Sequence, residues 1–341
     1  MLNFYRQLDR RLQQEAVVVA TVMGVKGSVP REVGAKMLIA ANQNTEGTIG
    51  GGAGEAKVIR QAMIVLQTGK KQQVEIDLTG NLQRQTEGIC GGTMQVWLER
   101  WQGETAIALT RQILHHLESG QTVTLVTPFA PEQSPFLLEE NSPEHSVLHS
   151  QSHSQSHPNT AFTETLTPPP TLLIVGAGHC GVELAKVADL IGFQVMVQDD
   201  RPEWANRDRY PQAARIFTEA IAPSLQALAA HAQLYVALVT RGYAYDLEAL
   251  QALLQRPIPC CYIGMIGSQK RVRQVMQAIA TPDMPTDLPM IHAPIGLDIG
   301  ALTPAEIAVS IAAELILVRR GGTGTPLSKA YSPQKQGDVS T

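Results

Sequence analysis

Three glycines that follow a short apolar run are the first residues in this chain that could do chemistry. They are Gly176, Gly178 and Gly181, in the segment Thr171-Leu-Leu-Ile-Val-Gly-Ala-Gly-His-Cys-Gly181. In a strand–turn–helix unit the first glycine permits the tight turn, the second lets backbone amides approach a phosphate, and the third lets the helix pack on its strand. The following helix would direct its unpaired N–H groups at the same loop. The spacing predicts a phosphate site.

A second apolar run supports this prediction. It covers residues 193–198 and is followed directly by Asp199, an acidic residue at the position where such folds bind a ribose hydroxyl. Strand, helix, second strand and terminal acid together predict half of a Rossmann domain. The alternative is a glycine-rich turn that binds nothing, because a fold does not by itself establish a ligand.

The remainder of the C-terminal half alternates between strand-like and helix-like segments, which predicts a parallel sheet with right-handed crossovers. Segments 240–246 and 264–271 fall at the carboxyl ends of their strands, where such folds bind ligands. Ser268 is a candidate helix N-cap, and Lys270 and Arg271 follow in the first turn. Cations are unfavourable there unless an anion lies nearby, so both are candidate ligand residues.

The N-terminal half contains a second glycine loop. Gly50, Gly51 and Gly52 precede a helix expected from residue 55, so their amides could converge on an oxyanion. Glu55 lies in the first turn, where it could stabilise the helix dipole or accept a hydrogen bond from a ligand amine. In an earlier polar loop, Arg31 could bind a phosphate or carboxylate, or it could be a solvated residue of a plain connection.

Cys90 precedes Gly91 and Gly92. On such an open backbone the thiol could ionise and act as a soft metal ligand, which makes Cys90 the candidate metal ligand. The alternative is a small buried hydrophobic residue. The flanking strands and helices predict a mixed α/β domain over residues 1–127.

Residues 128–170 are rich in Pro, Ser, Gln and Thr and are expected to be a flexible linker, stiffened by proline at its end. The linker contains four histidines at intervals of four residues: His145, His149, His153 and His157. On a helix they would share one face and could bind a transition metal, but their neighbours favour a low-complexity spacer. A Rossmann-like domain is expected over 171–320, and a tail over 321–341.

Composition narrows the function classes. The 341 residues carry a formal net charge of -4, which argues against a nucleic-acid partner. No apolar run is long enough to span a membrane, and the N-terminus has no signal-peptide pattern, so a cytoplasmic protein is expected. The four cysteines form no CxxC pair, which fits a reducing compartment.

Taken together, these motifs resemble the XdhC/CoxI family. The resemblance spans nearly the whole chain except the histidine-rich linker, and it rests on Gly27-Ser-Val-Pro-Arg31, Gly47-Thr-Ile-Gly-Gly-Gly52 with Glu55, Cys90-Gly-Gly92, the Gly176 fingerprint, Asp199-Asp-Arg-Pro202, Tyr262-Ile-Gly-Met-Ile-Gly-Ser268 and Ile295-Gly-Leu-Asp-Ile-Gly300.

The resemblance implies an accessory protein of molybdenum hydroxylases such as xanthine dehydrogenase. Such a protein binds the molybdenum cofactor, as molybdopterin or in a nucleotide form, and protects it during sulfuration by a cysteine desulfurase. It then delivers the cofactor to the hydroxylase apoenzyme. The family often has Cys or His and then an aliphatic residue where this chain has Ala53 and Gly54, so either Cys90 is the metal ligand or the protein contacts only the pterin. We also expect a homo-oligomer.

Two other classes compete with this interpretation. An NAD(P)-dependent oxidoreductase would use Asp199 on a ribose and Arg201 on a 2′-phosphate, with His179 as a candidate acid. This hypothesis leaves the N-terminal glycine motifs unexplained. The third class is an interaction protein that uses its Rossmann domain as a docking surface.

Overall fold

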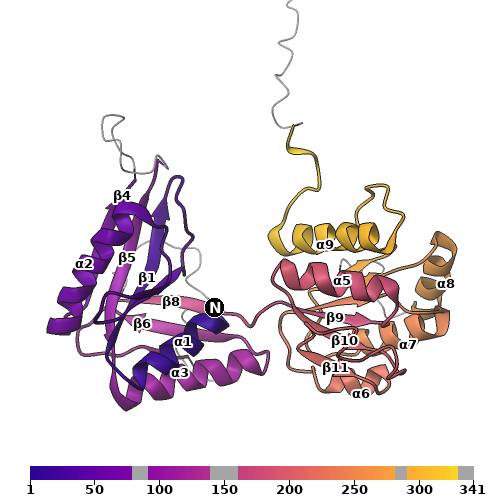
Figure 1. Cartoon of the computed structure of the whole chain (residues 1–341), viewed down its shortest axis with the longest axis horizontal. Coiled ribbons are helices and arrows are strands. Elements are labelled where there is room, and N and C mark those ends of the chain that lie inside the picture. The colour runs from indigo at the N-terminus through magenta and orange to yellow at the C-terminus, as the bar shows by residue number, and fades with distance from the viewer. Residues whose placement is uncertain (79–90, 139–159, 281–289, 329–341) are drawn as a thin grey trace, which may run out of the picture. The chain divides into compact units, whose positions relative to one another are not determined.

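The computed structural model describes residues 1–78, 91–138, 160–280 and 290–328. The chain divides into two compact units, Met1–Pro168 and Pro169–Thr341 (Figure 1). Both units combine helices with sheets, so the predicted α/β fold class is confirmed. Among the described residues, no helix is both long and apolar enough to cross a membrane.

The first unit is built on a five-stranded antiparallel sheet with the strand order β3-β2-β1-β5-β4. Its strands are β1 (Val17–Lys26), β2 (Lys36–Ile39), β3 (Thr45–Gly47), β4 (Gln72–Asp77) and β5 (Thr93–Trp101). Alternate residues of a strand point to opposite faces, so the central strands supply two separate cores. Val18, Ala20 and Val22 belong to one core, and Val17 and Val19 belong to the other.

Helices cover both faces of this sheet. α2 (Gly52–Thr68) packs on the first face through Val58, Ala62 and Val65. α1 (Leu2–Leu12) and α3 (Gly103–Glu118) pack on the second face. α2 begins at Gly52 with Gly51 as its N-cap, so the triple-glycine loop leads directly into this helix.

The segment expected as a linker contributes strands to the first unit. A three-stranded antiparallel sheet joins β6 (Val123–Pro128) to β7 (Phe136–Leu137) and β8 (Ala161–Leu166). The unit thus extends to Pro168 and not only to the expected boundary at residue 127. In β8 the exposed positions alternate with half-buried ones and only Leu166 is buried, so the strand does not stand out among its polar neighbours. His145, His149, His153 and His157 lie outside the described residues.

The second unit is built on a six-stranded parallel sheet with the strand order β11-β10-β9-β12-β13-β14. Its strands are β9 (Thr171–Val175), β10 (Gln194–Gln198), β11 (Arg215–Phe217), β12 (Leu234–Leu238), β13 (Tyr262–Met265) and β14 (Ile291–His292). Counted within the unit, this is the order 3-2-1-4-5-6 of a Rossmann fold. The predicted Rossmann-like C-terminal domain is confirmed.

Helices also cover both faces of the parallel sheet (Figure 1). α5 (His179–Leu190) and α9 (Pro304–Arg320) pack on one face, and α6 (Ile221–Gln226), α7 (Tyr243–Leu254) and α8 (Gln269–Ile279) pack on the other. The order of the strands reverses between β9, which pairs with β10, and β12. Ligands of such folds bind in the crevice at this reversal.

Candidate functional site

The glycine fingerprint of the second unit has the geometry that its spacing predicts. Gly176 has φ +108°, and a Cβ there would lie 2.5 Å from the Val239 carbonyl oxygen, so only glycine fits. A Cβ on Gly181 would lie 2.5 Å from the Gly176 carbonyl oxygen, which explains the close packing of α5 on β9. A Cβ on Gly178 would meet no atom within 4 Å. The loop is therefore open at the position where a phosphate would approach.

Asp199 holds this loop in place. Its side chain is buried, and Oδ2 accepts a hydrogen bond of 2.8 Å from the Ala177 amide. Arg201 donates to both carboxylate oxygens over 2.8 Å. Burial raises the pKa of Asp199, but the hydrogen bonds from Arg201 and from the backbone outweigh it, so the pKa is lowered overall. Asp199 is thus a charged clamp on the glycine loop, and its predicted contact with a ribose stays a prediction.

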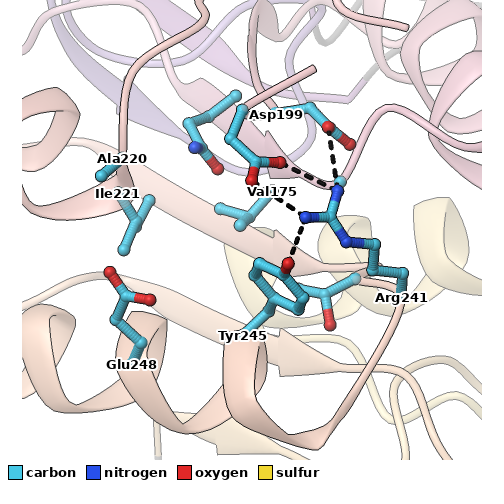
Figure 2. A pocket seen from close by; sticks show the side chains of 11 residues that line it. Val175, Asp199, Ala220, Ile221, Arg241, Tyr245 and Glu248 are labelled. Carbon is cyan, nitrogen blue, oxygen red and sulfur yellow. Dashed lines mark hydrogen bonds and ion pairs between the residues drawn. The ribbon is translucent and has the colours of Figure 1, made fainter.

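A pocket opens beside this clamp at the carboxyl ends of β9, β10 and β12 (Figure 2). It encloses about 480 Å³, including the solvent at its mouth. Apolar side chains from Val175, Ala220 and Ile221 line one part of it. Its polar lining residues are Gln198, Asp199, Asp200, Thr240, Arg241, Tyr245 and Glu248. An apolar wall beside polar groups that can bind hydroxyls would suit the base and sugar of a nucleotide.

Arg241 crosses the polar side of this pocket. Its guanidinium forms two hydrogen bonds of 2.9 Å with Asp200 and lies 3.7 Å from Asp199. It also donates to the Tyr245 hydroxyl and stacks on the Tyr245 ring, 4.0 Å from the ring centre (Figure 2). These charge-assisted bonds raise the pKa of Arg241 further above its ordinary value. A ligand entering the pocket would meet an arginine that is already oriented.

The sequence did not single out Arg241, although it placed segment 240–246 at this edge of the sheet. The sequence analysis did not single out Tyr245 or Glu248 either, because their positions in the pocket depend on how α7 faces the loop after β10. An arginine directly after an apolar strand was the only signal that could have indicated them.

Cationic and aromatic side chains surround the other side of the glycine loop. Arg209 donates to the Ala177 carbonyl over 3.4 Å and lies 4.7 Å from the centre of the Trp204 ring. Arg201 lies over the same ring at 5.0 Å, and His179 meets it edge-on at 6.0 Å. Trp204 therefore orients two guanidinium groups and an imidazole near the start of α5.

Lys270 and Arg271, the two cations in the first turn of α8, differ in their surroundings. Arg271 donates to the buried Asp246 over 2.6 Å and to the Thr240 hydroxyl over 2.9 Å. This pair ties α8 to α7, so an internal carboxylate supplies the anion that the sequence led us to expect. Burial raises the pKa of Asp246, despite the opposing effects of Thr240 and Arg271. Lys270 is exposed, and its role as a ligand stays a prediction.

In the first unit, Glu55 organises the triple-glycine loop. Its Oε2 accepts hydrogen bonds from the Thr48 hydroxyl over 2.6 Å and from the amides of Gly51 and Ile49 over 3.0 and 3.3 Å. Gly51 and Gly52 have φ values of +79° and +65°, and a Cβ on either would meet no atom within 4 Å. The loop is preformed, and its backbone faces open space.

Two further loops pack against this one. A Cβ on Gly50 would lie 2.4 Å from the Pro30 side chain, which places the Arg31 loop beside the triple-glycine loop. A Cβ on Gly92 would lie 2.5 Å from the carbonyl oxygen of Ser28, so the Gly91–Gly92 turn lies against the same loop. Arg31 itself is exposed. Cys90, directly before this turn in the sequence, lies outside the described residues.

The Gly50 amide donates to the Thr48 hydroxyl and the Gly51 amide to Glu55, so an anion such as a phosphate would have to bind the amides that follow Gly51 at the start of α2, where the helix dipole favours negative charge. Gly54, however, has a packing role, since a Cβ there would lie 2.7 Å from Ile76 Cγ2. No cluster of three or more His, Cys, Asp or Glu side chains suited to a metal occurs in the described part of the chain.

The fold and site define a two-unit α/β protein whose second unit is a Rossmann domain with an intact glycine loop. The profile described as "XdhC Rossmann domain" matches residues 172–315, and that described as "XdhC and CoxI family" matches residues 11–77. The chain belongs to the XdhC/CoxI family.

Individual relatives match over both units. The chain is 29% identical to a Bacillus subtilis protein named as a probable subunit of xanthine dehydrogenase, over 94% of this chain and 98% of that protein. It is 25% identical to the uncharacterized protein YqeB of Escherichia coli over 97% of this chain, which spans 49% of YqeB. A crystal structure described as a xanthine dehydrogenase from Bacillus halodurans superposes with a TM-score of 0.73 at 27% identity, over 96% of this chain and 99% of that one.

Proposed function

We propose that this protein is an accessory factor in the maturation of a molybdenum hydroxylase such as xanthine dehydrogenase. It would bind the molybdenum cofactor as cargo, protect it while a cysteine desulfurase supplies sulfur, and deliver it to the apoenzyme. The observation that carries this proposal is the family match to both units, together with a relative named for xanthine dehydrogenase that matches over 94% of the chain.

The loops of the first unit support a role in cofactor binding. The backbone at Gly52 faces open space at the start of α2, directly after the Gly51 amide that donates to Glu55, and this position would suit the terminal phosphate of molybdopterin. Arg31, on the neighbouring loop, would add a guanidinium that can bind a phosphate through two parallel hydrogen bonds. Cys90 would supply a soft thiolate ligand on the metal side. Glu55 acts as a positioning residue, because it holds the loop from within the protein.

The pocket of the second unit supports binding of a nucleotide. Its apolar wall and polar rim suit a base and a ribose, and the open backbone at Gly178 suits the attached phosphate. Such a site would bind the nucleotide portion of a dinucleotide form of the cofactor. It would equally suit NAD(P), which is why the oxidoreductase remains the second candidate.

An anaerobic titration separates these two functions. The purified full-length chain is titrated with molybdenum cofactor and, in parallel, with NADH and NADPH. We expect saturable binding of the cofactor that weakens at least about tenfold in Cys90→Ala, because a metal–thiolate contact is lost. Cys261→Ala, which changes a half-buried thiol of the second unit, is the matched control and should bind as the unaltered protein does. Binding of a nicotinamide nucleotide without cofactor binding would instead establish the oxidoreductase.

Delivery is tested by reconstitution. Cofactor-loaded protein is mixed with a molybdenum hydroxylase apoenzyme, and the recovery of hydroxylase activity is followed over time. We expect faster recovery than with free cofactor, and a further increase when a cysteine desulfurase and cysteine are present during loading. Equal rates with and without the protein would contradict the proposed role.

A further inference from the structure

Among the charged side chains that line the pocket of the second unit, Glu248 is the one without a partner in the described part of the chain. The other two carboxylates are both paired, Asp199 with Arg201 and Asp200 with Arg241. A carboxylate only accepts hydrogen bonds. Glu248 therefore presents an unused acceptor to a ligand in the pocket.

Helix α7 directs Glu248 into the pocket. Glu248 follows Tyr245 by three residues, so the two side chains share one face of the helix. Figure 2 shows the Glu248 carboxylate on the side of the pocket that Ala220 and Ile221 line. Ile221 is 5% exposed and belongs to the core on this face of the parallel sheet, so the apolar wall is fixed in place. A flat ring that lay against this wall would present its edge to Glu248.

The glycine loop determines which end of a nucleotide would reach Glu248. Gly176 lines the same pocket, and the backbone is open at Gly178, where the start of α5 favours a phosphate. A phosphate beside Glu248 would instead meet a negative charge that is not paired with any described cation. A nucleotide would therefore bind with its phosphates at the glycine loop and its base toward Glu248.

The base must then offer Glu248 a hydrogen-bond donor. The exocyclic amine of adenine or cytosine is such a donor, whereas hypoxanthine and uracil carry a keto oxygen at the same ring position. Two acceptors that face each other repel, which rejects the keto bases. We propose that Glu248 determines base specificity by accepting a hydrogen bond from an exocyclic amine, so that the pocket prefers nucleotides of adenine or cytosine to those of hypoxanthine or uracil. This inference rests on the nucleotide site of the proposed function.

Calorimetry on the full-length chain tests the preference with two pairs of nucleoside diphosphates. ADP is compared with inosine diphosphate (IDP), and CDP with UDP, because the members of each pair differ at the ring position that carries the amine or the keto oxygen. We expect ADP to bind at least about tenfold more tightly than IDP, and CDP at least about tenfold more tightly than UDP, since the site rejects a base that lacks the donor.

The substitution Glu248→Gln tests whether this residue is the cause. An amide can accept a hydrogen bond through its oxygen and donate one through its nitrogen, so it can satisfy either kind of base. We expect the difference within each pair to fall below about threefold in Glu248→Gln. The fold should be unaffected, because Glu248 is exposed and has no described partner to lose. An unchanged midpoint of thermal unfolding checks this.

Glu203→Gln is the matched control. Glu203 is an exposed glutamate of the same unit that does not line the pocket, so the control removes the same charge without touching the base. It should keep the full preference for ADP and CDP. A general effect of net charge on phosphate binding would change both variants alike.

Two kinds of failure can be told apart. Equal binding within each pair, or a preference that Glu248→Gln retains, would overturn the role of Glu248 while leaving the nucleotide site in place. If none of the four nucleotides binds, the nucleotide site itself is refuted, and this inference with it. The titration with molybdenum cofactor and the reconstitution of a hydroxylase test the accessory role separately.

Discussion

At the scale of the residue, the observed contacts of Asp199 differ from the contact that its position in the sequence predicts. Its position after the second Rossmann strand predicts a ribose contact. Its observed partners are the Ala177 amide within the glycine loop and the Arg201 guanidinium. The carboxylate therefore stabilises the site itself, which makes its contribution measurable without any ligand.

Replacing Asp199 should destabilise the second unit. Asp199→Asn keeps the shape of the side chain but removes the negative charge to which the Ala177 amide and the Arg201 guanidinium donate. Hydrogen bonds to charged groups contribute roughly 1.5–3 kcal/mol each. We expect the free energy of unfolding to fall by about 2–3 kcal/mol, measured by urea denaturation. The control is Asp200→Asn, which removes a partly exposed pair with Arg241 and should cost less than about 1 kcal/mol. Equal costs would show that Asp199 is not a clamp.

The same carboxylate should make stability depend on pH in a defined window. Its folded-state pKa lies below the ordinary value of 3.8, so the folded state prefers the ionised form. The stabilisation is complete above the unfolded-state pKa and is lost as pH falls through the lower folded value. We expect the difference in thermal stability between the unaltered protein and Asp199→Asn to be constant above about pH 5 and to shrink below about pH 4. A difference that grows on acidification would contradict this.

At the scale of the element, the glycine loops are defined by what surrounds their backbones. Gly181 faces a carbonyl oxygen of its own loop, whereas Gly178 faces open space. The fingerprint therefore separates into a position that packs α5 on the sheet and a position that leaves room for a ligand. The same division occurs in the first unit, where Gly54 packs on Ile76 and Gly51 and Gly52 are open.

This division predicts opposite outcomes for two matched substitutions. Gly181→Ala should lower the free energy of unfolding by at least about 2 kcal/mol, because its Cβ would overlap backbone. Gly178→Ala should change stability by less than about 0.5 kcal/mol, because its φ of -74° suits alanine and its Cβ meets nothing. Gly178→Ala should nevertheless weaken the binding of ADP at least about tenfold, because the added methyl group narrows the space through which the phosphate approaches the loop. Calorimetry measures this binding. If Gly178→Ala binds ADP as tightly as the unaltered protein, the phosphate does not use this loop.

At the scale of the whole molecule, each unit has its own cores. The first unit has one core on each face of its antiparallel sheet, and the second has one on each face of its parallel sheet. Because each core lies within one unit, each unit meets the usual requirement for independent folding.

We therefore expect residues 169–341, produced alone, to unfold cooperatively in urea and to bind ADP as the intact chain does. The matched fragment 1–168 should also unfold cooperatively. By contrast, a fragment of residues 1–127 should be unstable, because it lacks β8, which pairs with β6 and contributes Leu166 to a core. Cooperative unfolding of 1–127 with unchanged stability would show that the domain boundary predicted from the sequence is sufficient.

The sequence by itself determined the Rossmann unit, because glycine spacing, apolar runs and helix periodicity are local features that directly reflect backbone requirements. It also determined the family, through motifs such as Gly47–Gly52 that keep their order along the chain. Only the tertiary structure decided that Arg241, Tyr245 and Glu248 meet Asp200 in one pocket, and that β8 completes the first unit. These contacts join residues distant in sequence, and their geometry depends on how strands are ordered in a sheet. Local pattern does not specify that order for short or polar segments.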